Sequence, residues 1–125
     1  PYGHFKLLDS VKNNPLLFIA TGTGISPYRS FIESYENLDY QIIHGTSYAN
    51  EAYEKEIYGD KYFHCVSREK KGDFNGRVTE YVNSISLSPN TNAFLCGNCD
   101  MIYDVFDLLQ DRGLPTGQIH TEVYF

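Results

Sequence analysis

The stretch LLFIATGTGISP runs from Leu16 to Pro27 and joins an apolar run, a glycine turn and a helix start. The continuous apolar residues from Leu16 to Ala20 are typical of a central parallel strand that is covered on both faces. The glycines of the turn allow a tight bend and a close approach of the backbone to a ligand. Ser26 is a suitable N-cap and Pro27 suits the first helical position. The turn therefore faces the positive end of a helix, where a phosphate commonly binds.

The composition is that of one ordinary domain with a net negative charge. The 125 residues are 42% hydrophobic and carry a net charge of −6, which is enough for one core and argues against a nucleic-acid partner. No apolar stretch is long enough for membrane insertion. The odd number of cysteines, three, favours reduced thiols and a cytoplasmic location. Histidines and cysteines lack zinc spacing, so we expect no metal site.

Short apolar runs alternate with helical patterns along the rest of the chain. Further strands are predicted at 40–44, 62–67, 92–96 and 118–122, and helices at 27–35, 50–58, 78–85 and 100–111. Gly113 is predicted to end the last helix, with Pro115 just beyond it. This alternation predicts an α/β domain: a five-stranded parallel sheet with helices on both faces, a Rossmann-like arrangement.

Polar segments follow several of the predicted strands and should meet at the carboxyl edge of the sheet, where such folds bind ligands. Ser67 and Arg68 offer a hydroxyl and a guanidinium suited to a phosphomonoester dianion. Arg77, at the start of the next helix, could bind the same group. Taken singly, each also fits a solvated strand end or a surface arginine. His44 is expected to pack or hydrogen-bond at its strand end, and Cys65 to be a core thiol.

The segment CGNC, from Cys96 to Cys99, has two interpretations. A C-x-x-C motif between a strand and a helix N-terminus lowers a thiol pKa in thioredoxin-like proteins, which would make this chain a disulfide-exchange module. Alternatively, Cys96 and Gly97 form the floor of a site, where Gly97 lets a ligand ring lie against the backbone. The motif follows the fourth strand of five, whereas thioredoxins carry it after an early strand, and this favours the second interpretation.

Taken together, these segments resemble, in order and spacing, the NADP-binding half of the ferredoxin–NADP reductase family. Four motifs carry the resemblance: GTGISP at 22–27, VSRE at 66–69, CGN at 96–98 and EVY at 122–124. The opening segment PYGHF looks like the last piece of the upstream flavin domain of that family. The resemblance therefore implies that residues 1–8 end a flavin-binding domain and that residues 9–125 are the NADP-binding domain of a longer chain.

The resemblance also implies roles for individual residues. The cofactor-binding residues would be Thr21, Gly22, Thr23, Gly24, Ser26 and Pro27 at the pyrophosphate loop, Ser67, Arg68 and Arg77 at the 2′-phosphate, Gly97 and Asn98 at the nicotinamide floor, and Phe125 at the terminus. Cys96 would lie near the nicotinamide carbon that exchanges hydride, and Glu122 close to the reacting rings. Tyr124 would stack on the flavin, although Phe125 is an equal candidate for that position. Ser47 and Tyr48 stand where bacterial members often have an arginine.

The activity implied by the resemblance is hydride transfer between NADP(H) and FAD, followed by electron exchange with ferredoxin or flavodoxin. The FAD would be bound mainly by the chain's own upstream flavin domain, so this chain alone should bind nucleotide and catalyse nothing. Three alternatives remain open at this stage: an NADH-linked flavin reductase of an oxygenase system, a thioredoxin-like redox module and a non-catalytic nucleotide-binding domain.

Overall fold

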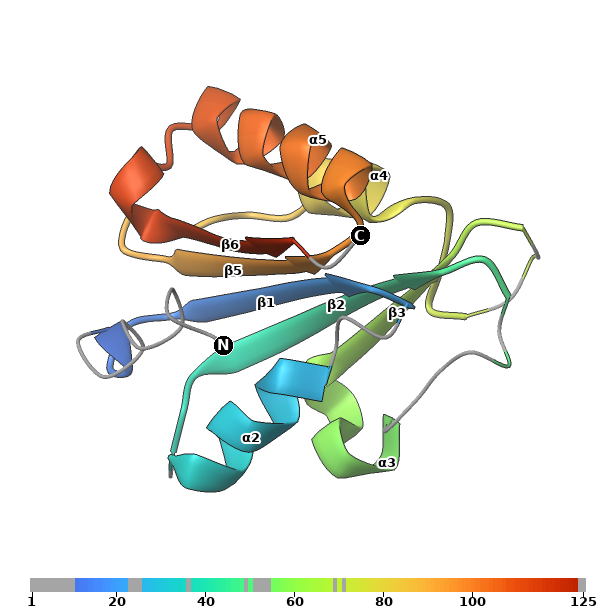
Figure 1. Ribbon diagram of the computed structural model, residues 1–125, viewed down its shortest axis with the longest axis horizontal. Helices are drawn as coiled ribbons and strands as arrows, with labels where there is room; N and C mark the ends of the chain where they lie inside the picture. The colour runs from blue at the N-terminus through green and yellow to red at the C-terminus, as the bar shows by residue number, and fades with distance from the viewer. Residues whose placement is uncertain are drawn as a thin grey trace.

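A parallel sheet forms the centre of the molecule, and helices pack on both of its faces (Figure 1). The computed structural model describes residues 11–22, 26–35, 37–48, 50, 55–68, 70 and 72–123. The strands there are β1 (Leu16–Thr21), β2 (Tyr40–Thr46), β3 (Tyr62–Val66), β4 (Phe74–Asn75), β5 (Asn92–Gly97) and β6 (Ile119–Val123). The helices are α2 (Ser26–Ser34), α3 (Lys55–Tyr58), α4 (Val78–Ser84) and α5 (Cys99–Asp111), with short 3₁₀ turns at Gly59–Lys61 and Thr116–Gln118.

Strand order decides where a ligand can enter this sheet. The order is β4-β3-β2-β1-β5-β6, and every neighbouring pair is parallel. From β1 the chain proceeds to β2 on one side and later returns to β5 on the other side. The order therefore reverses between β1 and β5, and their carboxyl ends, at Thr21 and Gly97, border the crevice in which open α/β sheets bind ligands.

The central strand β1 is buried on both faces, as its apolar run predicts. Leu16, Phe18 and Ala20 belong to the core cluster on the α2 and α3 side. Leu17 and Ile19 belong to the cluster under α4 and α5, which cover the upper face in Figure 1. Side chains of a strand alternate between faces, so two cores require apolar residues at every position. This confirms that the apolar run at the start of the stretch is a central parallel strand.

The predicted apolar faces of the helices are confirmed. Tyr28 of α2 is fully buried, and its Oη lies 2.7 Å from the carbonyl oxygen of Ile19 and 2.6 Å from that of Phe94. The predicted end of α5 is also confirmed, because Gly113 has a φ of +96° and the Leu114 N–H donates to the Leu109 carbonyl at 3.0 Å. This pattern of bonds is a Schellman motif, which needs a residue that tolerates a left-handed conformation.

The structure differs from the sequence prediction in three places. The five predicted strands are present, but β4 adds a sixth, two residues long, beside β3 at the edge of the sheet. It has no detectable sequence period because two residues show none. Of the helix predicted at 50–58, α3 covers Lys55–Tyr58, and residues 51–54 lie outside the described part. Helix α2 begins at Ser26 itself, one residue before the predicted start. The side chain of Ser26, the predicted N-cap, lies outside the described part.

Candidate functional site

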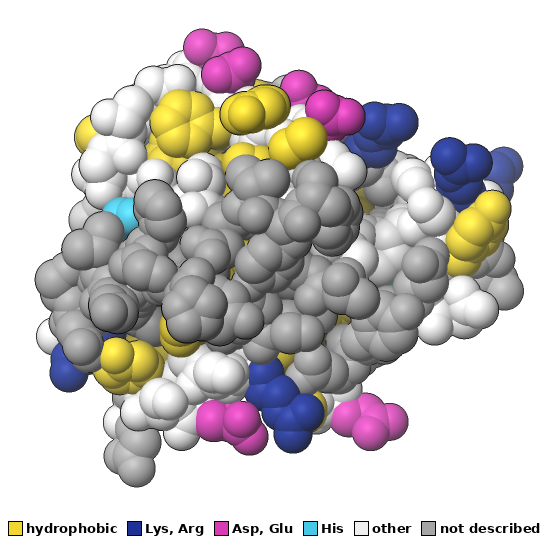
Figure 2. All heavy atoms as spheres, in the orientation of Figure 1, with side chains coloured by type: hydrophobic (Ala, Val, Ile, Leu, Met, Phe, Trp, Pro, Cys, Tyr) yellow, Lys and Arg dark blue, Asp and Glu magenta, His cyan; other side chains and the backbone are white. Residues whose placement is uncertain are grey.

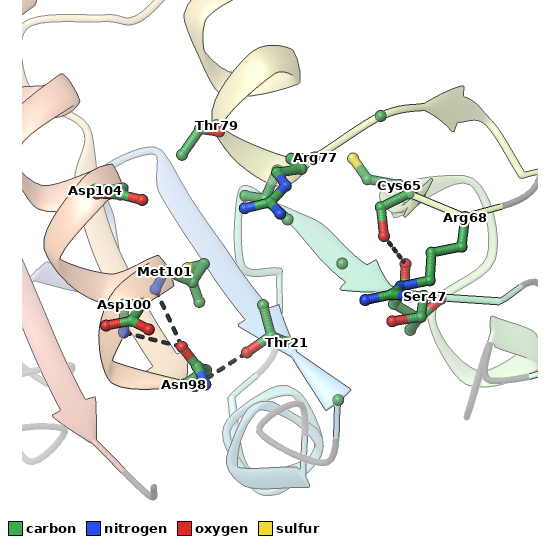
Figure 3. A pocket seen from close by; sticks show the side chains of 16 residues that line it. Thr21, Ser47, Cys65, Arg68, Arg77, Thr79, Asn98, Asp100, Met101 and Asp104 are labelled. Atoms are coloured by element: carbon green, nitrogen blue, oxygen red, sulfur yellow. Dashed lines mark hydrogen bonds between the residues drawn. The ribbon is translucent and has the colours of Figure 1, made fainter.

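A cavity of about 430 Å³ opens at the carboxyl edge of the sheet, beside the point where strand order reverses (Figure 3). Its lining comes from segments that are far apart in the sequence: the ends of β1, β2 and β3, the start of α4 and the first turns of α5. The lining residues are Thr21, Gly22, Gly45, Thr46, Ser47, Cys65, Ser67, Arg68, Gly76, Arg77, Val78, Thr79, Asn98, Asp100, Met101 and Asp104. This volume is in the range of sites for small organic ligands.

One side of the cavity is basic, and we call Ser67, Arg68 and Arg77 the arginine wall. The backbone N–H of Ser67 donates to the Thr46 carbonyl at 3.1 Å, and that of Arg68 to the Ser47 carbonyl at 2.9 Å. These bonds continue the pairing of β2 with β3 beyond the end of β3, so the loop is held beside Ser47. Figure 3 shows Arg68 next to Ser47. Ser67 and Arg68 therefore have a defined backbone position, although their side chains are exposed.

Arg77 completes the arginine wall from the start of α4, which follows β4 along the chain. Its N–H donates to Oε1 of Glu80 at 3.0 Å, which anchors the start of α4. The salt bridge found in the described part of the chain joins Arg29 to Glu33 on α2. Among the described residues, therefore, no carboxylate forms a salt bridge with the guanidinium of Arg68 or of Arg77.

The opposite side of the cavity is acidic, and we call Asp100 and Asp104 the aspartate wall. They lie one turn apart on α5, so they share a face of that helix. Asn98 caps α5: its Oδ1 accepts from the N–H of Asp100 at 2.9 Å and from that of Met101 at 3.3 Å. Figure 2 also shows acidic and hydrophobic side chains together over α5. This cap satisfies two of the free N–H groups at the helix start.

A contact between Gly97 and Thr21 links the carboxyl ends of β5 and β1 beside the cavity. The N–H of Asn98 donates to Oγ1 of Thr21 at 3.0 Å, which ties the end of β5 to the end of β1. Gly97 has a φ of +130°, and a Cβ at this position would lie 2.5 Å from Oγ1 of Thr21. The glycine is thus required by contact with the protein itself, in addition to any ligand that lies above it.

Two cysteines lie inside the fold near this edge. Burial raises the pKa of the Cys65 thiol to about 12, with further contributions from the charges of Asp73 and Glu80. Cys65 is therefore a neutral core thiol, as predicted. Cys96 is fully buried in the cluster on the α2 side, and it forms no disulfide with Cys99.

The cavity brings together half of the predicted cofactor-binding residues. These six are Thr21, Gly22, Ser67, Arg68, Arg77 and Asn98. Gly97 is buried at the floor, and the backbone of Glu122 pairs with that of Cys96 between β6 and β5. The other predicted residues lie outside the description: Thr23, Gly24, Tyr124 and Phe125 entirely, and Ser26, Pro27 and Glu122 in their side chains.

Sequence reasoning missed the aspartate wall and Thr79 as cavity residues. Asp100 and Asp104 stand at i and i+4 in the helix that follows the CGN motif, and this spacing was the available signal. Spacing alone does not show which face of a helix borders a cavity. Ser47, by contrast, follows β2 directly, and it lines the cavity at the carboxyl edge where the sequence placed it.

Two further searches of the described residues concern membranes and metals. Among them, none of the helices combines the length and the apolar character that crossing a membrane requires. Within the same residues, no group of three or more histidine, cysteine, aspartate or glutamate side chains could hold a metal ion.

Comparisons with known proteins agree on the type of domain. The family model described as oxidoreductase NAD-binding domain matches residues 18–107. The flavodoxin/ferredoxin–NADP reductase of Buchnera aphidicola subsp. Baizongia pistaciae is 30% identical over 154 aligned positions, covering 99% of this chain. The chain spans 62% of the length of that curated relative. These matches confirm the resemblance that the four motifs indicated.

Solved structures with the same fold include more distant proteins. Flavohemoglobin from Malassezia yamatoensis, with bound FAD and heme, superposes with a TM-score of 0.81 at 22% identity, covering 94% of this chain and 34% of the other. A variant of ferredoxin–NADP⁺ reductase from Plasmodium falciparum in complex with 2′P-AMP has a TM-score of 0.56 at 24% identity, covering 93% of this chain and 55% of the other. At these identities the comparisons establish the fold.

Proposed function

Because this chain belongs to the family of oxidoreductase NAD-binding domains, we propose that its cavity binds NADP(H), with the 2′-phosphate at the arginine wall. The observation that carries the proposal is the pair of guanidinium groups, of Arg68 and Arg77, that no described carboxylate neutralises. Together with the hydroxyl of Ser67, they suit a phosphomonoester dianion, which is the group that distinguishes NADP from NAD.

The remaining parts of the nucleotide follow from strand order. The diphosphate lies over the turn after β1, beside Thr21 and Gly22, because ligands of such sheets bind where strand order reverses. The nicotinamide then extends toward the end of β5, where Cys96 is in register with Glu122 of β6 and Gly97 with Val123. We assign Cys96, Glu122 and Tyr124 to the region around the reacting rings, with Phe125 as the second candidate for covering the flavin.

In the longer protein that we propose, residues 1–8 end a flavin-binding domain and the nucleotide domain follows. FAD would supply the centre that exchanges hydride with NADP(H), and ferredoxin or flavodoxin would exchange electrons with it. The curated relative is named for both partners. This chain's own contribution is to bind the nucleotide and orient its nicotinamide. By itself it should bind nucleotide without catalysing electron transfer.

The thioredoxin-like alternative finds little support in the geometry. A thiol that exchanges disulfides must be accessible and ionised, whereas Cys96 is fully buried in a core cluster. The NADH-linked alternative predicts no preference for a nucleotide with a 2′-phosphate, and a binding measurement distinguishes it from our proposal.

Calorimetric titration of this chain with 2′,5′-ADP and with 5′-ADP tests the proposal. We expect clear preference for 2′,5′-ADP. Arg68→Ala should weaken its binding by about 1.5–3 kcal/mol, roughly 10- to 150-fold, because it removes hydrogen bonds to a charged group. Binding of 5′-ADP should change little in this variant.

Lys70→Ala is the matched control, because Lys70 is exposed, lies two residues away and does not line the cavity. It removes the same charge and should change affinity by no more than about twofold, since exposed charges at a distance are screened. Equal binding of both nucleotides would instead favour the NADH-linked reductase. Equal losses for both nucleotides in Arg68→Ala would show that Arg68 does not contact the 2′-phosphate.

A further inference from the structure

A buried histidine at the end of β2 contacts the backbone of Gly22, which follows β1. His44 of β2 is fully buried, and its Nε2 lies 2.7 Å from the carbonyl oxygen of Gly22. On its other side, Nδ1 is hydrogen-bonded to the hydroxyl of Tyr62 in β3. The three residues therefore form a chain, Tyr62–His44–Gly22, that runs from β3 across β2 to the end of β1.

The chemistry of the partners determines the direction of each hydrogen bond in this chain. A carbonyl oxygen only accepts, so Nε2 of His44 must carry the proton that it donates to Gly22. In the neutral ring, Nδ1 then accepts from the hydroxyl of Tyr62. Burial, followed by the charge of Asp73, raises the pKa of Tyr62 and keeps this hydroxyl protonated. One tautomer of neutral His44 thus satisfies both of its nitrogens.

Through the Gly22 carbonyl, the hydrogen bonds of Tyr62 and His44 reach the lining of the cavity. Gly22 lines the cavity and has a φ of +54°, a conformation that ordinary residues rarely adopt. The hydrogen bond from His44 holds this carbonyl toward β2. A carbonyl oxygen turned into the cavity would instead place partial negative charge against an anionic ligand.

A second histidine, His64, is connected through Thr46 to the segment that follows β2. Oγ1 of Thr46 donates to the carbonyl of Tyr48 at 2.8 Å, so it accepts from Nε2 of His64, 2.6 Å away. The rings of His44 and His64 are stacked, with centroids 5.9 Å apart. The two histidines therefore form one buried polar layer. It is connected to the Gly22 carbonyl directly through His44, and to the Tyr48 carbonyl through His64 and Thr46.

We propose that His44 is a positioning residue of the nucleotide site, which holds the Gly22 carbonyl toward β2 so that the end of β1 can accept a dinucleotide diphosphate. This inference rests on the proposed function. It does not place His44 in contact with the ligand. It separates the two ends of the nucleotide: the arginine wall binds the 2′-phosphate without help from His44, whereas binding of the diphosphate depends on it.

The test compares two ligands, 2′-AMP and NADP⁺, by NMR titration of this chain and its His44→Phe variant. The first ligand carries only the phosphate that the arginine wall binds, and the second also has the diphosphate. Phenylalanine fills a similar volume but cannot donate to Gly22. We expect roughly tenfold weaker binding of NADP⁺, the effect of losing about one hydrogen bond, and unchanged binding of 2′-AMP. His44→Gln keeps an N–H donor at the reach of Nε2 and should recover most of the NADP⁺ affinity.

His120→Phe is the matched control. His120 is 8% exposed in β6, and its Nε2 lies 3.1 Å from Oδ1 of Asn92, at the amino end of β5 and away from the cavity. This variant also loses a buried histidine hydrogen bond, so it should destabilise the fold without changing the ratio of the two affinities. Tyr62→Phe, which removes the other partner of His44, should shift that ratio in the same direction as His44→Phe.

Each outcome bears on a definite claim. If the unsubstituted chain binds neither ligand, the proposed function and this inference both fail. If it binds both and His44→Phe leaves the NADP⁺ affinity unchanged, or weakens both ligands equally, only the positioning role is wrong. If His44→Phe does not fold, Tyr62→Phe decides, and an unchanged affinity ratio in that variant overturns the role.

Discussion

The two walls of the cavity have opposite charge and are built in different ways. The arginine wall stands on the loop after β3, held by backbone bonds to Thr46 and Ser47, and on Arg77 at the start of the short helix α4. The aspartate wall stands on α5, a 13-residue helix with a side-chain cap at Asn98. The comparison indicates that the helix sets a fixed negative boundary, which confines an anionic group to the opposite, loop-built wall.

The contact between Gly97 and Thr21, beside the cavity that the two walls border, offers the largest expected effect on stability. Gly97→Ala should destabilise the fold by about 2–4 kcal/mol, because it adds backbone strain and a Cβ 2.5 Å from Oγ1 of Thr21. Gly113→Ala is the control, since Gly113 has a φ of +96° but no atom within 4 Å of the added Cβ. It should cost about 1–2 kcal/mol, from strain alone. Urea denaturation measures both, and equal costs would mean that the contact with Thr21 adds nothing to the backbone strain.

The thiol of Cys65, which lines the cavity beside the arginine wall, provides a pH test of burial. Cys65 has a pKa of about 12 in the folded state, against 9.0 as the ordinary value. Above pH 9 the unfolded chain therefore releases a proton that the folded chain keeps, and the free energy of unfolding falls as pH rises toward 12. The slope from this group is at most about 1.4 kcal/mol per pH unit.

Urea denaturation between about pH 8 and about pH 10 should show a shallower fall in Cys65→Ala than in the unsubstituted chain. Identical slopes in the two proteins would indicate that Cys65 ionises as readily in the folded state as in the unfolded chain, and that burial does not raise its pKa.

The aspartate wall should give the smallest effect, and one of opposite sign. Asp104→Asn removes a negative charge that faces the same cavity as the arginines, so affinity for 2′,5′-ADP should rise about two- to fivefold at low salt. Asp107→Asn is the matched control, because Asp107 is exposed on the same helix but does not line the cavity. If both variants raise affinity equally, the effect is one of net charge and the wall has no local role.

Much of the fold could be predicted because its signals are local. An uninterrupted apolar run requires burial on both faces, so β1 had to be a central strand. Apolar spacing and Gly113 similarly predicted α5 and its end. The edge strand β4 could not be predicted, since Phe74 and Asn75 are too few to show a period. It forms because β3 offers an open edge, and the N–H of Gly76 donates to the Val66 carbonyl at 2.8 Å.

The candidate site divides in the same way. Ser67, Arg68 and Arg77 could be identified from the sequence, because strand direction brings residues that follow a strand to the carboxyl edge. Asp100 and Asp104 could not, since charged residues at helical spacing usually form a solvated face. Only the packing of α5 beside β5 turns that face toward the arginines. Likewise, strand order alone brings Gly22, His44 and Tyr62 into one chain of hydrogen bonds, because residues of three different strands meet only after the sheet has formed.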